Sequence, residues 1–241
     1  MLDLDIRKGR VSDIRYRLLP VFSELLKPDP AMAALIEKLR QPQAAGYAEK
    51  IATADRLLYR RGNFGGTVDQ VICEALSNEF GAEIALSPGF RWGNSILPGQ
   101  PVTMEDVLSE TAITYPETYA VSMTGRQIKD VLEDVCDTLF NTDPYYQQGG
   151  DMVRVGGLAY TCMPGEALGR RISDLKLAND RPLEAGKSYK VAGWASVNEQ
   201  QGTPIWDVLA KHLASGKTAD LRGGGITLKG VDDNPGFARQ G

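Results

Sequence analysis

Apolar residues recur three and four positions apart in three stretches of the chain, which predicts three amphipathic helices. The first begins at Thr67, the second directly follows Thr124 and ends near residue 139, and the third spans residues 205–213. Thr67 and Thr124 are each followed three residues later by a glutamine, which is the spacing of a capping box. The apolar faces consist of Val68, Val71, Ile72, Ala75 and Leu76 in the first helix, of Ile128, Val131, Leu132, Val135, Cys136 and Leu139 in the second, and of Ile205, Trp206, Leu209 and Leu213 in the third.

Short runs of β-branched and aromatic residues between these helices predict strands. The strands are grouped between helices of unequal spacing, which favours a mixed β-sheet covered by helices over a regular βαβ series. The predicted fold class is therefore α+β. The predicted strands span residues 83–86, 119–123, 152–155, 158–162, 172–177, 189–192 and 226–229.

The residues before position 57 follow a different pattern, typical of a connection between two domains. Two strand-like runs, at residues 2–6 and 11–20, flank the turn RKG. A long helical segment follows, and Pro42 marks a break or kink in it. We divide the chain into the end of one domain (residues 1–28), an interdomain linker helix (29–56), a large domain (57–229) and a tail without periodicity (230–241).

Composition lowers the expectation of a role in binding nucleic acid or lipid. The 241 residues are 42% hydrophobic and 24% charged, which is enough for a sizeable core. The formal net charge of −4 gives no long-range attraction to nucleic acid or to anionic lipid. No run approaches the roughly 20 apolar residues of a membrane-spanning helix, and the first residues lack the apolar centre of a signal peptide.

The scarcity of histidine argues against independent catalysis. His212 is the only histidine, so neither a dinuclear metal site nor a Ser-His-Asp triad is indicated, and we expect a structural role for it. Cys73, Cys136 and Cys162 lack C-x-x-C spacing, and the first two lie on apolar helix faces. We expect them to pack in a core instead of forming a disulfide framework or a zinc site. We therefore expect no catalytic residue and no metal ligand in this chain.

Two glycine-containing segments are candidates for binding an anion. RRGNFGGT, residues 60–67, places Arg60, Arg61 and Asn63 before a helix N-terminus, where free N–H groups and the helix dipole favour an anion. SPGFRWG, residues 87–93, places Arg91 between glycines and two large aromatic residues. A tight strand-to-helix turn with solvated arginines is the alternative for the first segment, which lacks the G-K-[ST] of a Walker A loop.

A third segment, DPYYQQGGDMVRVGGLAYT (residues 143–161), predicts an aromatic loop that leads into a strand. Tyr145, Tyr146 and two glutamines stand directly before a pair of glycines, and the strand-like residues 152–155 follow. Binding residues concentrate on loops that a rigid scaffold supports. Tyr145 and Tyr146 are therefore candidates for binding a substrate.

Four segments, in this order along the chain, resemble the SoxB-type thiosulfohydrolases, a branch of the 5′-nucleotidase-like metallophosphoesterases. They are RRGNFGGTVDQVICEAL, SPGFRWGNSILPGQ, TAITYPETYAVSMTG and DPYYQQGGDMVRVGGLAYT. The resemblance implies that residues 57–229 are a 5′-nucleotidase-like C-terminal substrate-binding domain. It also implies that residues 1–28 are the last strands of an absent N-terminal metallophosphoesterase domain, that Met1 lies inside the parent sequence, and that the parent is periplasmic.

In the wider 5′-nucleotidase family, the C-terminal domain supplies arginines for the anionic group of the substrate and two aromatic rings for the base. Arg91, together with Arg60 or Arg61, resembles those arginines, and Tyr115 in AITYPETY and Trp194 in VAGWASVNEQQGTPIWD resemble the rings. Plain packing of the two aromatics is the alternative. The sequence EQQGTPIWD replaces the glycine- and aspartate-rich signature of nucleotidases, which argues against nucleotide binding.

The resemblance implies a substrate-binding fragment of a metal-dependent hydrolase. The parent would release sulfate from a cysteine S-thiosulfonate on the swinging arm of a SoxYZ-like sulfur-carrier protein, and the sulfonate would pair with guanidinium groups. Two divalent metal ions, expected to be manganese, belong to the absent domain, so the fragment itself is expected to be inactive. Two alternatives stay open: the C-terminal domain of a 5′-nucleotidase or nucleotide-sugar hydrolase, and a non-catalytic peptide-binding module.

Overall fold

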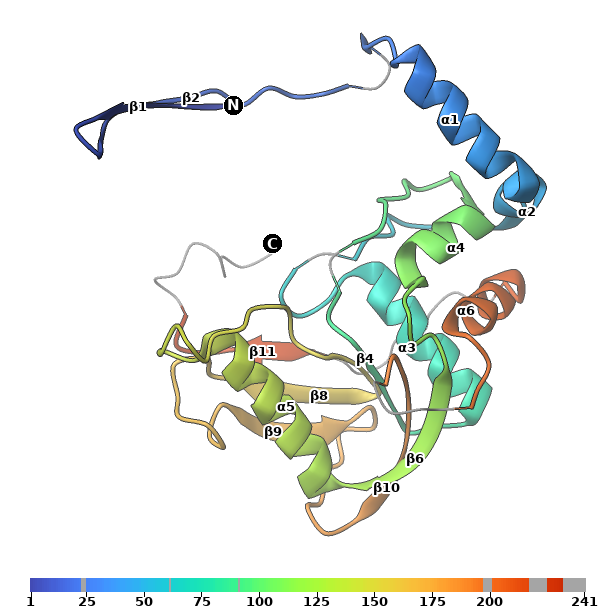
Figure 1. The fold of residues 1–241 in the computed structure, drawn as a ribbon. Coiled ribbons are helices and arrows are strands. Elements are labelled where there is room, and N and C mark those ends of the chain that lie inside the picture. Colours follow the sequence, from blue (N-terminus) through green and yellow to red (C-terminus); the bar gives the residue numbers. More distant parts are fainter. Residues whose placement is uncertain (23–24, 61, 91, 197–200, 217–224, 232–241) are drawn as a thin grey trace. The chain divides into compact units, whose positions relative to one another are not determined.

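The computed structural model describes residues 1–22, 25–60, 62–90, 92–196, 201–216 and 225–231 (Figure 1). The chain divides into two compact units, Met1–Ala45 and Gly46–Gly241, which are described separately below. No helix in the described ranges is long and apolar enough to cross a bilayer.

The unit Met1–Ala45 contains a hairpin and a helix without a core of their own. β1 (Leu2–Arg7) pairs antiparallel with β2 (Arg10–Tyr16), as predicted, although the second strand ends before residue 20. α1 (Pro30–Arg40) is capped by Asp29, whose side chain accepts a hydrogen bond from the Met32 N–H, and the 3₁₀ turn η2 (Gln41–Gln43) follows. None of the described residues of this unit is buried.

The larger unit is organised around a four-stranded sheet with the order β6-β10-β4-β7 (Figure 1). The strands are β6 (Thr118–Thr124), β10 (Ser188–Trp194), β4 (Ile84–Ser87) and β7 (Arg154–Gly156). β10 and β4 pair in parallel, whereas the two outer pairs are antiparallel. The sheet is thus mixed, as predicted.

A second sheet has the order β11-β8-β9, formed by β11 (Ile226–Leu228), β8 (Leu158–Cys162) and β9 (Ile172–Leu177). The chain passes from β7 in the first sheet to β8 in the second through Gly157, whose φ is 71°. A Cβ at this position would lie 2.2 Å from the Glu83 carbonyl oxygen. Only glycine combines this backbone angle with so close an approach.

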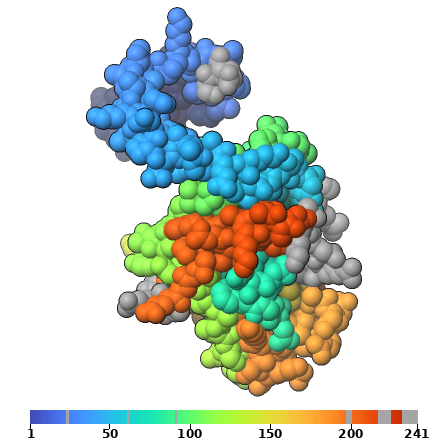
Figure 2. Space-filling view, turned by 90° about the vertical axis from the view of Figure 1, so that its right-hand side faces the viewer, coloured from blue at the N-terminus to red at the C-terminus, as the bar shows by residue number. Residues whose placement is uncertain are grey.

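Helices cover the four-stranded sheet on both faces. α3 (Thr67–Phe80) and α6 (Ile205–Ala214) enclose one core with Ala85 and Trp194, and Figure 2 shows α6 beside α3 on the surface. α5 (Gly125–Phe140) lies in a second core with Ile84, Leu86 and the strands β8 and β9. The predicted apolar face of α5 is buried at Ile128, Leu132, Cys136 and Leu139.

The predicted α+β class is confirmed, but two local predictions need correction and one helix was missed. The first helix is capped by Gly66, and the carboxylate of Asp69, not Gln70, accepts the returning hydrogen bond. Residues 50–53 of the predicted linker helix form β3 (Lys50–Thr53), because they pair with β5 (Pro101–Thr103), so the helical part ends with α2 (Ala44–Tyr47). A further helix, α4 (Met104–Thr111), was not predicted.

The structural roles of the cysteines and of His212 agree with expectation. Cys73, Cys136 and Cys162 are free and buried in the two cores. The Sγ atoms of Cys136 and Cys162 are 3.7 Å apart, and burial raises the pKa of the Cys73 thiol. His212 is buried on α6, where its Nε2 lies 3.7 Å from the Glu74 carboxylate.

Candidate functional site

The glycine loop, residues 62–66, leads into the N-terminus of α3. The Asp69 carboxylate, in the first turn, accepts a hydrogen bond from the Gly66 N–H (2.9 Å). The Val68 N–H donates to the Tyr59 carbonyl (3.1 Å). A carboxylate of the protein thus already occupies the positive end of this helix, where the sequence predicted a bound anion.

Arg60, which directly precedes this region, is buried and bonded to other parts of the protein. It is only 1% exposed, and its Nε donates to Asp69 Oδ1 at 2.8 Å. Its Nη1 donates to the Glu110 carbonyl (2.6 Å) and its Nη2 to the Pro88 carbonyl (2.9 Å). These contacts describe a structural role, and substrate binding by Arg60 stays a prediction.

A second buried arginine, Arg154 at the start of β7, shares the same carboxylate. Its Nε lies 3.3 Å from Asp69 Oδ2, and its Nη2 is 3.1 Å from the Asp151 carboxylate. The same Nη2 donates to the Gly62 carbonyl (2.9 Å) and lies 3.5 Å from the Phe90 carbonyl. Two guanidinium groups and two carboxylates therefore form one buried network, in which Asp69 bridges the arginines.

This network connects three segments that are far apart in the sequence. The Met152 N–H donates to the Asn63 carbonyl (2.9 Å), which joins the segment before β7 to the glycine loop. Gly89 packs against the same segment: a Cβ there would lie 2.5 Å from the Met152 carbonyl oxygen and 2.6 Å from that of Asp151. The loop after β4 can approach so closely because residue 89 has no side chain.

An aromatic cluster lies beside the arginines. The rings of Phe90 and Trp92 are stacked with centroids 3.9 Å apart, and the Trp194 ring meets Phe90 edge-on at 5.9 Å. Trp194 is buried and its Nε1 donates to Ser87 Oγ (2.8 Å), whereas Trp92 is 41% exposed. The Arg60 guanidinium carbon is 5.4 Å from the Phe90 ring centroid and 5.8 Å from that of Trp194, within cation–π range.

The Glu110 carboxyl group is buried next to this cluster, at the end of α4. Neither of its oxygens accepts a well-formed hydrogen bond within the part of the chain described. Gly93 packs directly on the Glu110 carboxyl group, so closely that a Cβ at Gly93 would lie 2.2 Å from Glu110 Oε2. Burial raises the pKa of Glu110 to about 7, against the opposing influence of Arg60 and of the Asn94 backbone N–H.

The predicted tyrosine loop, residues 141–150, is an ordered turn at the end of α5. The Asp143 side chain accepts a hydrogen bond from the Tyr145 N–H (2.9 Å), and its carbonyl accepts one from the Tyr146 N–H (3.0 Å). The Gln147 side chain donates to the Leu139 carbonyl (2.9 Å). Tyr145 is 92% exposed and Tyr146 is 65% exposed, so both rings face solvent from a loop whose backbone is tied down.

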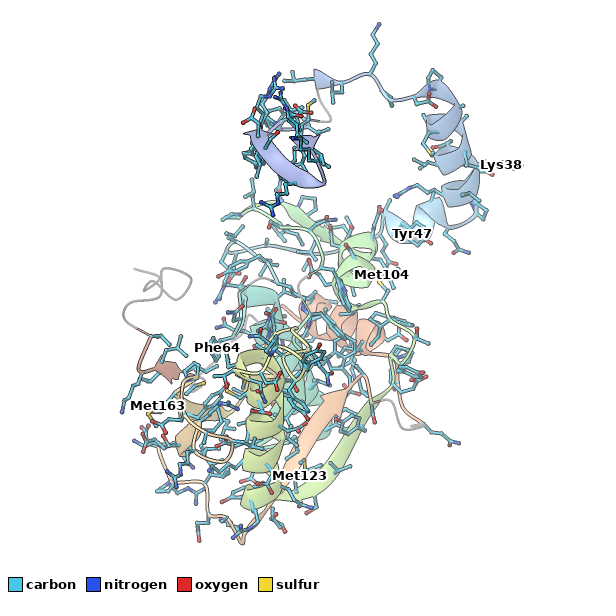
Figure 3. The ribbon with its side chains drawn as sticks, turned by 60° about the vertical axis from the view of Figure 1, so that its left-hand side comes forward. Lys38, Tyr47, Phe64, Met104, Met123 and Met163 are labelled. Carbon is cyan, nitrogen blue, oxygen red and sulfur yellow. The ribbon has the colours of Figure 1, made fainter. Side chains whose placement is uncertain are left out.

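At the other end of the site, the glycine loop is anchored by an aromatic contact. Phe64, labelled in Figure 3, stacks on Phe140 with ring centroids 6.3 Å apart. The glycine loop and the tyrosine loop therefore both meet the C-terminal end of α5.

The structure brings some of the predicted residues together and leaves others apart. Arg60 and Trp194 are buried side by side, Asn63 contributes its carbonyl to the same region, and Tyr115 is exposed. Arg61 and Arg91 lie outside the described residues. Arg154, Asp69, Asp151, Glu110 and Trp92 were not predicted; the one available signal was a charged residue, Arg154, in the otherwise apolar run MVRVGG.

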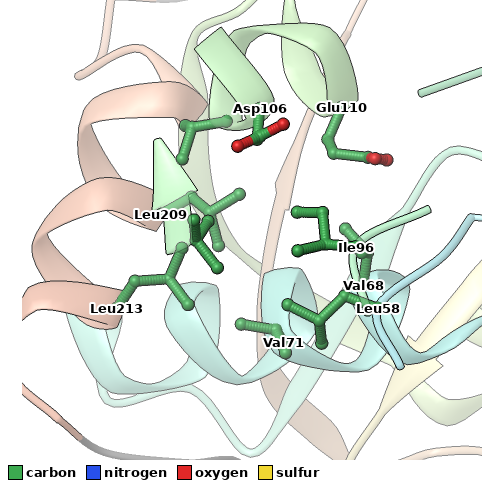
Figure 4. A pocket seen from close by; sticks show the side chains of 10 residues that line it. Leu58, Val68, Val71, Ile96, Asp106, Glu110, Leu209 and Leu213 are labelled. Atoms are coloured by element: carbon green, nitrogen blue, oxygen red, sulfur yellow. The ribbon is translucent and has the colours of Figure 1, made fainter. Parts of the chain in front are cut away.

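Two cavities lie in this unit. One of about 20 Å³ is lined mostly by apolar residues, including Leu58, Ile96 and residues of α3, α4 and α6, together with Asp106 and Glu110 (Figure 4). A cavity of about 290 Å³ lies between β3, α3 and α6 and includes Asp55 and Arg56, whose side chains are paired at 3.0 Å. Within the described ranges, no group of three or more His, Cys, Asp or Glu side chains could hold a metal ion.

The candidate site thus consists of loops rich in glycine and aromatic residues on an α+β scaffold, joined by two buried arginines. The sequence matches the family described as 5'-nucleotidase, C-terminal domain, over residues 48–219. The chain belongs to this family, which confirms the predicted resemblance at family level. The match begins nine residues before the predicted domain boundary at residue 57, in agreement with the position of β3.

One solved structure supports the same assignment, and two others share the fold. The sulfate thiohydrolase SoxB of Thermus thermophilus, in complex with glycerol, has a TM-score of 0.84 and 33% identity, covering 95% of this chain and 44% of that chain. A 5'-nucleotidase precursor from Thermus thermophilus has a TM-score of 0.73 and 17% identity, over 95% and 49%. A putative 5'-nucleotidase from Staphylococcus aureus has a TM-score of 0.62 and 14% identity, over 94% and 49%.

The two nucleotidases show a shared fold alone. This chain spans less than half the length of each of the three solved proteins. A comparison with curated proteins gives no match.

Proposed function

We propose that this chain is the substrate-binding C-terminal part of a SoxB-like thiosulfohydrolase. It would recognise a carrier-protein arm bearing a cysteine S-thiosulfonate, from which the parent enzyme releases sulfate during thiosulfate oxidation. The observation that carries the proposal is the 33% identity with Thermus thermophilus SoxB over 95% of the chain, compared with 17% and 14% for the nucleotidases. The activity, substrate and partner of the whole protein are all part of the proposal, because the chain covers only 44% of the SoxB chain.

The chemistry of the site is compatible with a flexible peptide that ends in a sulfonate. A sulfonate needs cationic donors, and planar guanidinium groups provide paired N–H donors for its oxygens. Since Arg60 and Arg154 are buried in the protein network, we assign the anion to Arg61 and Arg91, which in the sequence directly precede the glycine loop and directly follow Phe90. Trp92, stacked on Phe90 but 41% exposed, offers an apolar surface beside Arg91 in the sequence.

The tyrosine loop would contact the peptide part of the carrier arm. Tyr145 and Tyr146 present large rings to solvent, and the Asp143 hydrogen bonds fix the backbone that carries them. Rings on an ordered loop lose little conformational freedom when they bind, which favours affinity. A SoxYZ-like sulfur-carrier protein in the periplasm is the proposed partner.

The residues of this chain would bind and orient the substrate and would not carry out the hydrolysis. Two divalent metal ions, proposed to be manganese, would lie in a separate metallophosphoesterase domain of the parent and would supply Lewis-acid chemistry. The chain alone is therefore proposed to be catalytically silent.

The proposal is tested by calorimetric titration with a short glycine-rich peptide that carries a cysteine S-thiosulfonate. Arg91→Ala should weaken binding at least about tenfold, because a charge-assisted contact to the sulfonate is lost. Arg170→Ala, which removes an exposed arginine far along the sequence from both loops, is the matched control and should bind as the wild type does. Equal peptide affinity in wild type and Arg91→Ala would contradict the proposal.

A further inference from the structure

Arg154 differs from an ordinary buried ion pair in the number of segments that it joins. Its guanidinium contacts the glycine loop at the Gly62 carbonyl, the loop after β4 at the Phe90 carbonyl, and the first turn of α3 at Asp69. It is also paired with Asp151, three residues earlier in its own segment. One side chain thus contacts three separate segments.

The contacts of Arg154 are not those expected of a residue that only stabilises the fold. Nε and Nη1 are buried and donate no hydrogen bond within the described part of the chain. A buried donor without a hydrogen bond lowers stability, and buried ion pairs can often be replaced by apolar residues without loss of stability. Retaining an incompletely bonded arginine at this point suggests a role beyond stability, because departures from a well-satisfied core concentrate at functional sites.

The geometry around Arg154 leaves little freedom for the loops to move separately. The Met152 N–H bonds the Asn63 carbonyl at 2.9 Å, and Gly89 packs against the carbonyl oxygens of Asp151 and Met152. The Met152 hydrogen bond and the Gly89 packing contact both involve residues within three positions of Arg154. A shift of the Arg154 guanidinium would therefore be transmitted to the glycine loop and to the loop after β4.

We propose that Arg154 is a positioning residue, which holds the glycine loop and the loop after β4 at the spacing required to bind the sulfonate of the substrate. This inference rests on the proposed function for its substrate, but the coupling between the loops is a property of the protein without ligand. Arg154 would act through these loops and would not itself touch the substrate.

The test compares Arg154→Lys and Arg154→Gln with a matched control, Arg171→Gln. Arg171 is also buried, but its hydrogen-bond partners, Asp137 and the Pro164 carbonyl, lie outside the three segments that Arg154 contacts. Each variant is examined by thermal unfolding, by hydrogen exchange of the Met152 amide without ligand, and by titration with the thiosulfonate peptide. All titrations are made well below the lowest midpoint of unfolding.

Arg154→Lys is the decisive variant, because lysine restores the charge but not the planar set of donors that bridges the loops. We expect a smaller loss of thermal stability than in Arg154→Gln, at least about tenfold faster exchange of the Met152 amide, and at least about tenfold weaker peptide binding. Arg154→Gln should show the same losses and a lower midpoint of unfolding. Arg171→Gln should lower the midpoint while leaving Met152 exchange and peptide affinity within about twofold of wild type, apart from the global change in stability.

Two results would overturn the inference. One is wild-type Met152 exchange in both Arg154 variants, which would show that the loops are not coupled through this residue. The other is a loss of affinity in Arg171→Gln as large as that in Arg154→Lys, which would reduce the effect to general stability. If the wild type itself fails to bind the peptide, the proposed function fails, while the exchange data still decide whether Arg154 couples the loops.

Discussion

Glu110 offers a direct test of the buried site, because its carboxyl group titrates in an accessible range. The group is buried without a well-formed hydrogen bond in the described part of the chain, and its pKa is raised from 4.5 to about 7. Glu110→Gln replaces this carboxyl with a neutral group of nearly the same shape. The variant should therefore remove the pH dependence that Glu110 contributes to folding.

The direction of the effect follows from the raised pKa in the folded state. Below pH 4.5 the carboxyl is neutral in both states, so burial causes no ionisation penalty. As the pH rises towards and past 7, the unfolded state is ionised while the folded state resists ionisation, and the wild type loses stability. A rise of the pKa from 4.5 to about 7 corresponds to at most about 3 kcal/mol, or roughly 6–12 °C in the midpoint for a unit of this size.

The assay is urea unfolding of the wild type and of Glu110→Gln at several pH values between 4.5 and 8.5. The difference in the free energy of unfolding should move in favour of Glu110→Gln as the pH rises. Groups common to both proteins cancel in this difference. Glu166→Gln, which alters an exposed glutamate, is the control and should show no comparable trend. A constant difference between wild type and Glu110→Gln across the range would show that the buried Glu110 carboxyl does not resist ionisation in the folded protein.

Three further predictions concern steric contact, thiol burial and the exposed loop. Gly89→Ala should lower the free energy of unfolding by about 1–3 kcal/mol, because the added Cβ would meet the Met152 carbonyl. Gly165→Ala is the control and should be nearly neutral, since a Cβ added there has no atom within 4 Å. Equal midpoints of unfolding for the two variants would count against the close packing at Gly89. The Cys73 thiol should react with a thiol reagent at pH 8 only after unfolding, since burial raises its pKa, and rapid labelling of the folded protein in mass spectrometry would exclude that burial. Tyr145→Ala should weaken thiosulfonate-peptide binding in calorimetry without lowering the midpoint of unfolding, because its ring is 92% exposed; unchanged affinity would remove the tyrosine loop from the proposed site.

The helices with long apolar faces could be predicted from sequence, because each is stabilised by packing a continuous stripe of apolar side chains into the core. α5 begins where Thr124 and Gln127 form the expected capping box, with the Gln127 N–H donating to Thr124 Oγ1 at 3.2 Å. α4 escaped prediction because it has only eight residues, although the Thr103 and Asp106 capping box was present in the sequence. The strand β3 could not be recognised because its partner, β5, lies about fifty residues away.

The candidate site was harder to predict, since its contacts join distant segments. Substrate binding by Arg60 stays a prediction. Its bond to the Glu110 carbonyl, fifty residues away, could not be predicted from the local sequence. Trp194 was identified as a ring of the site, but its hydrogen bond to Ser87 and its burial depend on the pairing of β10 with β4. The exposure of Tyr145 and Tyr146 agreed with the interpretation as a loop, because Asp143 and the glycines are local signals.

The most direct test of the proposed function is a set of three calorimetric titrations of the wild-type chain. The ligands are the peptide with cysteine S-thiosulfonate, the same peptide with a free thiol, and AMP. The account predicts that the thiosulfonate peptide binds at least about tenfold more tightly than the thiol peptide, because only the former carries the sulfonate, and that AMP does not bind. Equal binding of the two peptides, or binding of AMP in preference to both, would contradict it.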